Sequence, residues 1–111
     1  EIFSDLSASA GQKLERAGAA NARLVDEDAM QANFGRKFDV IAVTASLPSQ
    51  VGRFVDLLNP EGRLFAVVGR APAMEAVLIF RHADGSATEK SLFETVLTPM
   101  INADQSEPFI L

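Results

Sequence analysis

The chain of 111 residues is long enough for one domain with a modest core, and no apolar run approaches the roughly 20 residues that span a membrane. Its net charge of −5 and ten scattered Lys and Arg residues argue against nucleic acid as a partner, because a phosphate backbone is bound mainly by clustered cations. The lack of Cys excludes disulfides and thiolate metal sites and predicts a reducing, cytoplasmic location, while the single His cannot build the usual imidazole zinc site.

The first part of the chain predicts a strand, a helix and a second strand. Residues 1–3 are typical of the tail of a strand, and Ser4 is a good residue to cap a following helix. Residues 21–25 form a second, short predicted strand, which the acidic cluster 26–28 follows. The helix is expected to end at Gly18 and to place four apolar residues on one face: Leu6, Ala10, Leu14 and Ala17.

A strand, a helix and a further strand are predicted for residues 38–68. Residues 38–44 (FDVIAVT) are almost continuously apolar, as in a strand that is buried on both faces of a parallel sheet. Residues 59–62 (NPEG) are expected to turn the chain into a buried strand at residues 63–68. Pro48 and Ser49 are expected to open a helix with an apolar face of Val51, Phe54, Val55 and Leu58. This alternation predicts right-handed crossovers and a parallel sheet.

The pattern changes after Gly69. Residues 74–81 and 88–98 are strand-like and are separated by the sequence HADGS, in which Asp84-Gly85 favours an antiparallel hairpin. His82 and Asp84 are therefore expected at a surface turn and not at a catalytic centre. Residues 102–111 are expected to form a loop.

Four segments resemble the protein-L-isoaspartate O-methyltransferase family. Residues 38–46 (FDVIAVTAS), followed by Pro48, are similar to the family's fourth strand, and residues 57–69 (LLNPEGRLFAVVG) to the stretch that leads into its fifth. Residues 91–100 (SLFETVLTPM) resemble its final strand. Glu1-Ile2 and the following residues 6–25 (LSASAGQKLERAGAANARLV) resemble its second strand, second helix and third strand.

The resemblance implies an α/β fold, the Rossmann-like three-layer sandwich of class I methyltransferases. Its sheet is mostly parallel and ends in an antiparallel hairpin, with the last strand inserted antiparallel. Residues 1–111 would be the C-terminal part of a single methyltransferase domain. The family's first strand and glycine-rich loop have no counterpart here, so we expect them upstream of Glu1. The gap in the sheet would have to be filled by that strand or by dimerisation across it.

The resemblance also implies S-adenosyl-L-methionine as cofactor. Glu1 matches the carboxylate that accepts hydrogen bonds from the ribose hydroxyls, and Asp28 the one that accepts from the adenine amino group. Thr44 and Ala45 lie at the carboxyl end of a central strand, where α/β sheets bind ligands. Simpler interpretations remain for this set of residues: a solvated terminus for Glu1, a solvated acidic loop for Asp28, and helix capping by Ser46 or Ser49 after the strand. The family has glycines beside its Asp, whereas this chain has Glu27 and Ala29.

No residue of the chain is assigned a catalytic role. A carboxylate acceptor has a reference pKa of about 4, is ionised at neutral pH and needs positioning more than a base. The resemblance implies methylation of L-isoaspartyl residues in damaged proteins, with such a protein or peptide as partner and repair as the outcome. A small-molecule methyltransferase, and a non-catalytic fragment or diverged homologue that no longer binds the cofactor, remain alternatives. The 111 residues alone are expected to be inactive.

Overall fold

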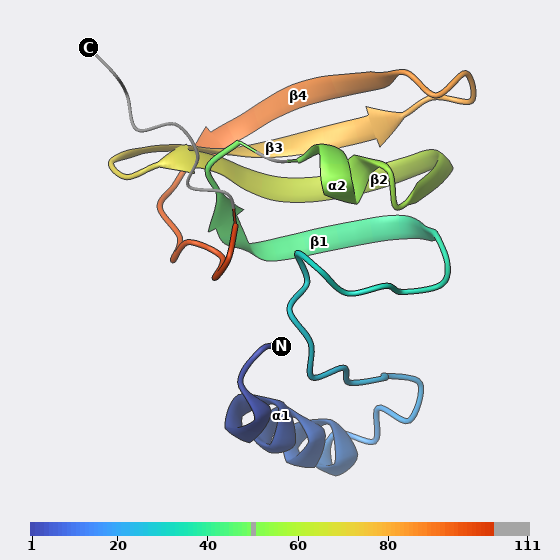
Figure 1. The fold of residues 1–111 in the computed structure, drawn as a ribbon, viewed down its shortest axis with the longest axis vertical. Coiled ribbons are helices and arrows are strands. Elements are labelled where there is room, and N and C mark those ends of the chain that lie inside the picture. Colours follow the sequence, from blue (N-terminus) through green and yellow to red (C-terminus); the bar gives the residue numbers. More distant parts are fainter. Residues whose placement is uncertain (50, 104–111) are drawn as a thin grey trace. The chain divides into compact units, whose positions relative to one another are not determined.

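The structure is a computed structural model that describes residues 1–49 and 51–103. The chain divides into two compact units, Glu1–Asn33 and Phe34–Leu111, which we call the helical unit and the sheet unit. Figure 1 shows six elements: α1 (Ser4–Arg16), β1 (Phe38–Leu47), α2 (Gly52–Val55), β2 (Leu58–Arg70), β3 (Ala73–Arg81) and β4 (Ala87–Glu94). Most of the loop expected at residues 102–111 lies outside the described residues.

Helix α1 of the helical unit ends where the sequence predicts. Gly18 has a left-handed φ of 70°, and its amide donates to the Glu15 carbonyl while the Ala19 amide donates to that of Leu14 at 2.9 Å. These bonds form a Schellman motif, which satisfies the last carbonyls of the helix. At the other end the cap is Phe3, in an extended conformation and without a side-chain capping bond, so the predicted capping role of Ser4 is wrong.

The strands predicted at residues 1–3 and 21–25 are not formed. The Glu1 amino group donates to the Val25 carbonyl at 3.0 Å, so the two segments do meet. A strand requires a repeating ladder of such bonds, and neither segment has a ladder partner in the described chain. Both segments therefore have a strand-like sequence but lack the repeated backbone hydrogen bonds of a β-ladder.

The sheet unit contains a four-stranded sheet in the order β1-β2-β3-β4. Strands β1 and β2 are parallel, whereas β2–β3 and β3–β4 are antiparallel. The predicted terminal hairpin is confirmed, but the sheet is mixed and not mostly parallel, and β4 lies at an edge instead of inserting between other strands. The cause is the short connections: Ala71 and Pro72 alone separate β2 from β3, and residues 82–86 separate β3 from β4, so consecutive strands must be neighbours.

The connection between β1 and β2 is tighter than predicted. Helix α2 has four residues, and Leu58, expected on its apolar face, begins β2. The predicted turn at residues 59–62 is a bulge inside β2, where the pairing jumps from Phe38–Leu58 to Val40–Arg63. Gly62 is required there, because a Cβ would lie 2.8 Å from the Asn59 carbonyl oxygen. The guanidinium nitrogen Nη1 of Arg81 donates to the carbonyls of Val55 and Leu58, both at 3.1 Å. These bonds connect the end of β3 to the end of α2 and the start of β2.

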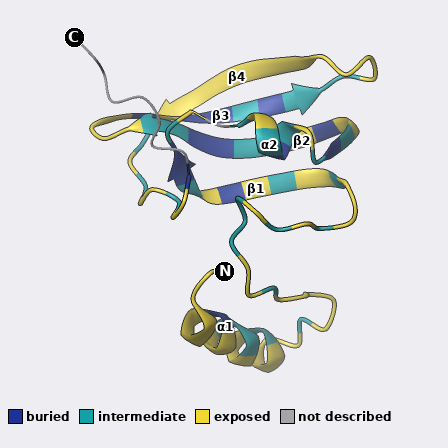
Figure 2. Cartoon of the chain, in the orientation of Figure 1, coloured by how far each residue is buried: buried dark blue, intermediate teal, exposed yellow. Residues whose placement is uncertain are grey.

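The core of the sheet unit lies on its two central strands (Figure 2). Leu64 and Ala66 of β2 and Val77 and Ile79 of β3 are buried, whereas β4 is exposed along its length. Strand β1 was predicted to be buried on both faces, and this is wrong. It occupies an edge of the sheet, where Val40 is 62% exposed, and the short helix of the sheet unit is too small to cover both faces.

Glu75 and Glu94 lie directly opposite each other in the β3–β4 ladder, and both are exposed. Like charges in this position repel. The substitution Glu94→Gln should therefore raise the free energy of unfolding by about 0.2–1 kcal/mol in urea denaturation at neutral pH. Glu89→Gln is the control, because Glu89 faces Ile79. A Glu94→Gln protein that gains no more stability than the control would contradict this reading.

Candidate functional site

A pocket of about 460 Å³ lies at the carboxyl ends of the parallel strands β1 and β2. This edge is where open α/β sheets bind their ligands. Five of the lining residues come from the end of β1, the end of β2 and the following turn: Ser46, Pro48, Gly69, Arg70 and Ala71. The others are Met74 of β3 and four residues beyond β4: Val96, Leu97, Thr98 and Pro99.

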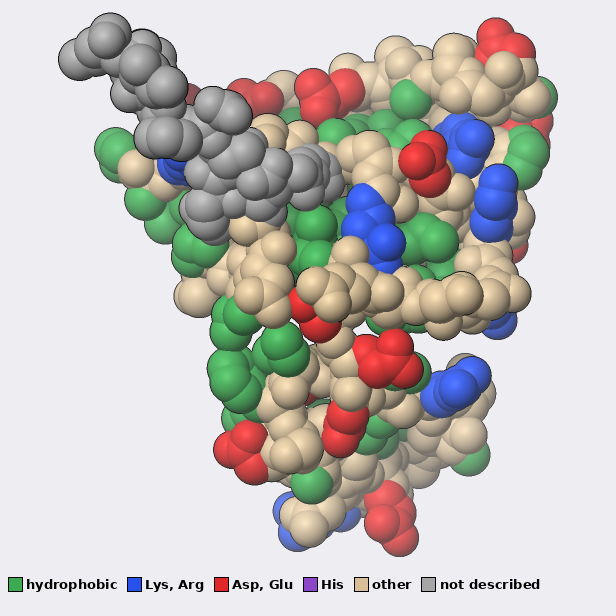
Figure 3. All heavy atoms as spheres, in the orientation of Figure 1, with side chains coloured by type: hydrophobic (Ala, Val, Ile, Leu, Met, Phe, Trp, Pro, Cys, Tyr) green, Lys and Arg blue, Asp and Glu red, His purple; other side chains and the backbone are tan. Residues whose placement is uncertain are grey.

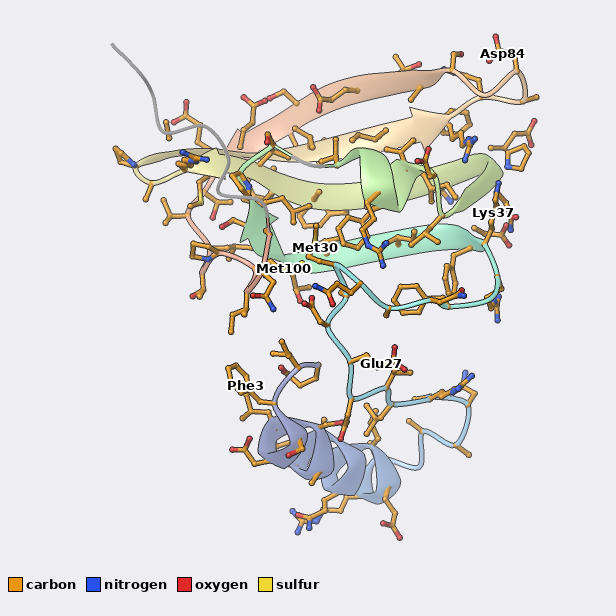
Figure 4. The ribbon with its side chains drawn as sticks, viewed as in Figure 1. Phe3, Glu27, Met30, Lys37, Asp84 and Met100 are labelled. Atoms are coloured by element: carbon orange, nitrogen blue, oxygen red, sulfur yellow. The ribbon has the colours of Figure 1, made fainter. Side chains whose placement is uncertain are left out.

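Residues 97–100, which we call the strap, form one wall of this pocket and are fastened to Ser46. The Ser46 amide donates to the Thr98 carbonyl at 2.9 Å, and the Met100 amide donates to the Ser46 carbonyl at 2.8 Å. The Ser46 hydroxyl donates to the Leu97 carbonyl at 3.0 Å, across 51 positions of sequence. Figure 4 labels Met100 on this segment. Ser46 is therefore not the helix cap that the sequence suggested.

The strap returns the chain from one edge of the sheet to the other, because it follows β4 and joins β1. On the way it crosses Met74, whose sulfur accepts from the Leu97 amide at 3.4 Å and whose carbonyl accepts from the Thr95 amide at 3.3 Å. The Leu97 side chain packs against a buried cluster of Val67, Met74 and Ala76. The strap is thus held both by hydrogen bonds and by the core.

Gly69, at the end of β2, is one of the residues that line the pocket. It has a φ of 123°, and a Cβ there would lie 2.4 Å from the Ala73 carbonyl oxygen. Neither the conformation nor the space accepts another residue. The tight turn from β2 to β3 therefore requires glycine at this position of the pocket lining.

Thr44 and Ala45, the predicted ligand residues of β1, lie immediately before Ser46 in the last part of that strand. Thr44 is exposed and Ala45 is half-buried. Neither lines the pocket, whereas Ser46 does. The rule that ligands bind at strand ends placed both residues at the end of β1, but it could not show that the next residue contacts the strap.

Glu1 and Asp28, the predicted cofactor carboxylates, belong to the helical unit. The bond from Glu1 to Val25 brings Glu1 beside the segment that leads to Asp28. The Glu1 carboxylate accepts from the Phe3 amide at 3.3 Å, and Asp28 Oδ1 accepts from the Met30 amide at 2.9 Å. Asp28 therefore organises a local turn between Glu27 and Met30, both labelled in Figure 4.

The hairpin tip carries the polar residues His82 and Asp84, as predicted for a surface turn. His82 Nε2 hydrogen-bonds to the Thr88 hydroxyl, and its ring packs against Phe80 with centroids 5.1 Å apart. Asp84, at the tip in Figure 4, accepts from the Ser86 hydroxyl at 2.6 Å and from the Ser86 amide at 2.9 Å. The hydrogen bonds of both side chains therefore stabilise the hairpin.

Hydrophobic as well as charged side chains reach the surface of the sheet unit (Figure 3). The most exposed large ones in this unit are Val40, Val96 and Phe93, and Val96 lies at the pocket. In the part of the chain that the structure describes, no group of three or more His, Cys, Asp or Glu side chains could hold a metal ion. None of the described helices is long and apolar enough to cross a membrane.

No family model matches the chain. A protein-L-isoaspartate O-methyltransferase of Stenotrophomonas maltophilia (strain K279a) is 37% identical over 65 residues, which are 59% of this chain and 29% of that protein. A Plasmodium falciparum protein assigned to the same enzymes was crystallised in complex with S-adenosyl-L-homocysteine. It matches with a TM-score of 0.76 at 20% identity, over 90% of this chain and 50% of that one. Both comparisons point to the protein-L-isoaspartate O-methyltransferase family.

The structural match supports a Rossmann-like class I methyltransferase fold for the chain. In the described residues the sheet is mixed, and few helices accompany it. The resemblance of the chain to protein-L-isoaspartate O-methyltransferases is confirmed by the Stenotrophomonas protein. The chain spans about half the length of the solved structure and less than a third of the Stenotrophomonas protein.

The pKa of the exposed Asp84 carboxyl lies below its ordinary value of 3.8, chiefly because the Ser86 hydroxyl donates to it and then because the Ser86 amide does. A lowered folded-state pKa stabilises the hairpin above about pH 4, and this contribution is lost as the pH falls through the folded-state value. The substitution Ser86→Ala should raise the Asp84 pKa towards 3.8 in an NMR titration of the carboxyl carbon. Ser91→Ala on β4 is the control, and equal pKa values in the two variants would refute the assignment.

Proposed function

We propose that the chain is part of an S-adenosylmethionine-dependent methyltransferase that esterifies the carboxylate of L-isoaspartyl residues in damaged proteins. The observation that carries this proposal is the pocket at the carboxyl ends of β1 and β2, on a chain whose relatives are protein-L-isoaspartate O-methyltransferases. In the methyl ester, the backbone amide nitrogen would attack the ester carbonyl and the methoxy group would leave as methanol, and hydrolysis of the resulting succinimide would permit partial return to normal aspartate. We also propose a cytoplasmic location, from the absence of Cys.

The residues proposed to hold the cofactor have suitable chemistry. Glu1 carries a carboxylate that can accept from two ribose hydroxyls at once, and Asp28 one that can accept from the adenine amino group. Asp28 Oδ1 already accepts a hydrogen bond from the Met30 amide. Asp28 could therefore bind adenine only if the turn that this bond stabilises were retained. Thr44 and Ala45 are small residues at the ligand-binding edge of the sheet and leave room for a methyl donor.

Bound S-adenosylmethionine would supply an electrophilic methyl group on a sulfonium. The contribution of this chain is then to orient the acceptor and to exclude water from it. A carboxylate needs no proton removed, and the described residues that line the pocket include no His, Lys, Asp or Glu that would act as a base. The site therefore suits a carboxylate acceptor better than an amine or a hydroxyl.

Strand β1 has one neighbouring strand in the described sheet, and on its outer edge the described residues form a single bridge, from Ser46 to Pro99 of the strap. Unpaired edges of this kind are normally covered or paired. We propose that a further strand pairs there, from the rest of the protein or from a second copy.

The proposal is tested on the full-length gene product that carries this chain. It should bind S-adenosylmethionine in calorimetric titration and transfer a labelled methyl group to an isoaspartyl peptide, but not to the same peptide with normal aspartate. Asp28→Asn keeps a side-chain oxygen for the turn but removes the charge, so it should weaken cofactor binding by roughly tenfold.

Asp26→Asn is the matched control for Asp28→Asn, because it removes a carboxylate from the same acidic cluster. The assignment of Asp28 fails if the two variants bind the cofactor equally well. The proposed function itself fails if the unmodified protein binds no S-adenosylmethionine.

A further inference from the structure

We infer that Ser46 is a positioning residue of the methyl-transfer site, which fixes the strap as the wall against which the acceptor segment binds. The inference rests on the proposed function and adds a residue and a subsite to it. Ser46 does not touch the reacting groups in this scheme. It acts through residues 97–100.

Ser46 has the properties of a residue kept for its hydrogen bonds. It is only 1% exposed, at the end of a strand whose other buried residues, Val43 and Leu47, are apolar. A buried hydroxyl is costly unless it is paired. Here the hydroxyl donates to the Leu97 carbonyl, while the amide and carbonyl of Ser46 bond to Thr98 and Met100. All the polar groups of the residue are thus directed at the strap.

The strap in turn shapes the pocket. Leu97 is anchored on Met74, and Thr98 and Pro99 line the cavity together with the exposed Val96 just before the strap. If residues 97–100 moved, this wall would move with them. The pocket volume of about 460 Å³ therefore depends on the bonds to Ser46.

The acceptor is a better occupant of this pocket than the cofactor. None of the four residues proposed to hold the cofactor lines it: Glu1, Asp28, Thr44 and Ala45. Its walls are largely apolar, with Pro48, Met74 and Leu97 among them, and such walls remove water from a bound carboxylate. Ser46 directly follows Ala45, so the pocket adjoins the proposed position of the methyl donor. This arrangement suits a peptide segment that presents its carboxylate at the end of β1.

The test compares Ser46→Ala and Ser46→Cys with Ser49→Ala in the full-length protein. Ser49 is an exposed serine nearby and serves as the matched control. Ser46→Ala should raise the KM for an isoaspartyl peptide by about tenfold, the effect of one lost hydrogen bond that leaves a buried carbonyl unpaired. The kcat and the dissociation constant for S-adenosylmethionine should stay within about twofold, because the reacting groups are untouched. Ser46→Cys should fall between, since a thiol is a weaker donor.

The split between KM and cofactor affinity separates positioning from a general loss of structure. An unchanged KM in Ser46→Ala overturns the inference, and so does a loss of cofactor affinity as large as the rise in KM. If Ser46→Ala does not fold by circular dichroism, the same criteria apply to Ser46→Cys. An unmodified protein without activity overturns the proposed function and this inference with it. An active protein whose Ser46 variants match Ser49→Ala overturns the inference alone.

Discussion

The candidate site of the sheet unit depends on the hydrogen bonds between Ser46 and the strap. Strands β1 and β4 lie at opposite edges of the sheet. Because each strand pairs with the next one in the chain, strand pairing alone would leave the end of the chain at the β4 edge. The strap brings the chain back to β1, where it forms hydrogen bonds with the amide, the carbonyl and the hydroxyl of Ser46. Since all these groups are buried, the loss of any partner would leave an unpaired polar atom in the interior.

The site follows from this closure together with a backbone constraint at Gly69 and the side-chain contacts of Met74. The tight turn after β2 requires glycine at position 69, which lines the pocket. Met74 then supplies both a hydrophobic contact and a sulfur acceptor for Leu97. The pocket is formed by parts that are distant in sequence but meet at the carboxyl ends of β1 and β2. This is the position in which an α/β sheet binds ligands.

Features with a local cause could be predicted from the sequence. The stop at Gly18 and the hairpin at Asp84-Gly85 were predicted correctly, because each depends on residues within a few positions. The cores of β1, β2 and β3 were also found from their apolar runs, whereas the strand predicted at residues 88–98 ends at Glu94. The placement of Thr44 and Ala45 at the end of β1 followed from the strand itself.

Features that depend on a distant partner could not be predicted. Residues 1–3 and 21–25 have strand-like composition, but a strand exists only where a neighbour completes its ladder. The exposure of Val40 reflects the position of β1 at an edge, which an apolar run cannot reveal. The bond from Ser46 to Leu97 spans 51 positions, so no local pattern encodes it, and the serine looked like a helix cap.

Amide hydrogen exchange at Met100 tests the role of Ser46 most directly, because this amide donates to the Ser46 carbonyl. In the unmodified protein it should exchange much more slowly than an unstructured peptide amide, and Ser46→Ala should accelerate it while the amide of the buried Ile79 in β3 stays protected. A Met100 amide that already exchanges at the unstructured rate in the unmodified protein would show that the strap is not held by Ser46.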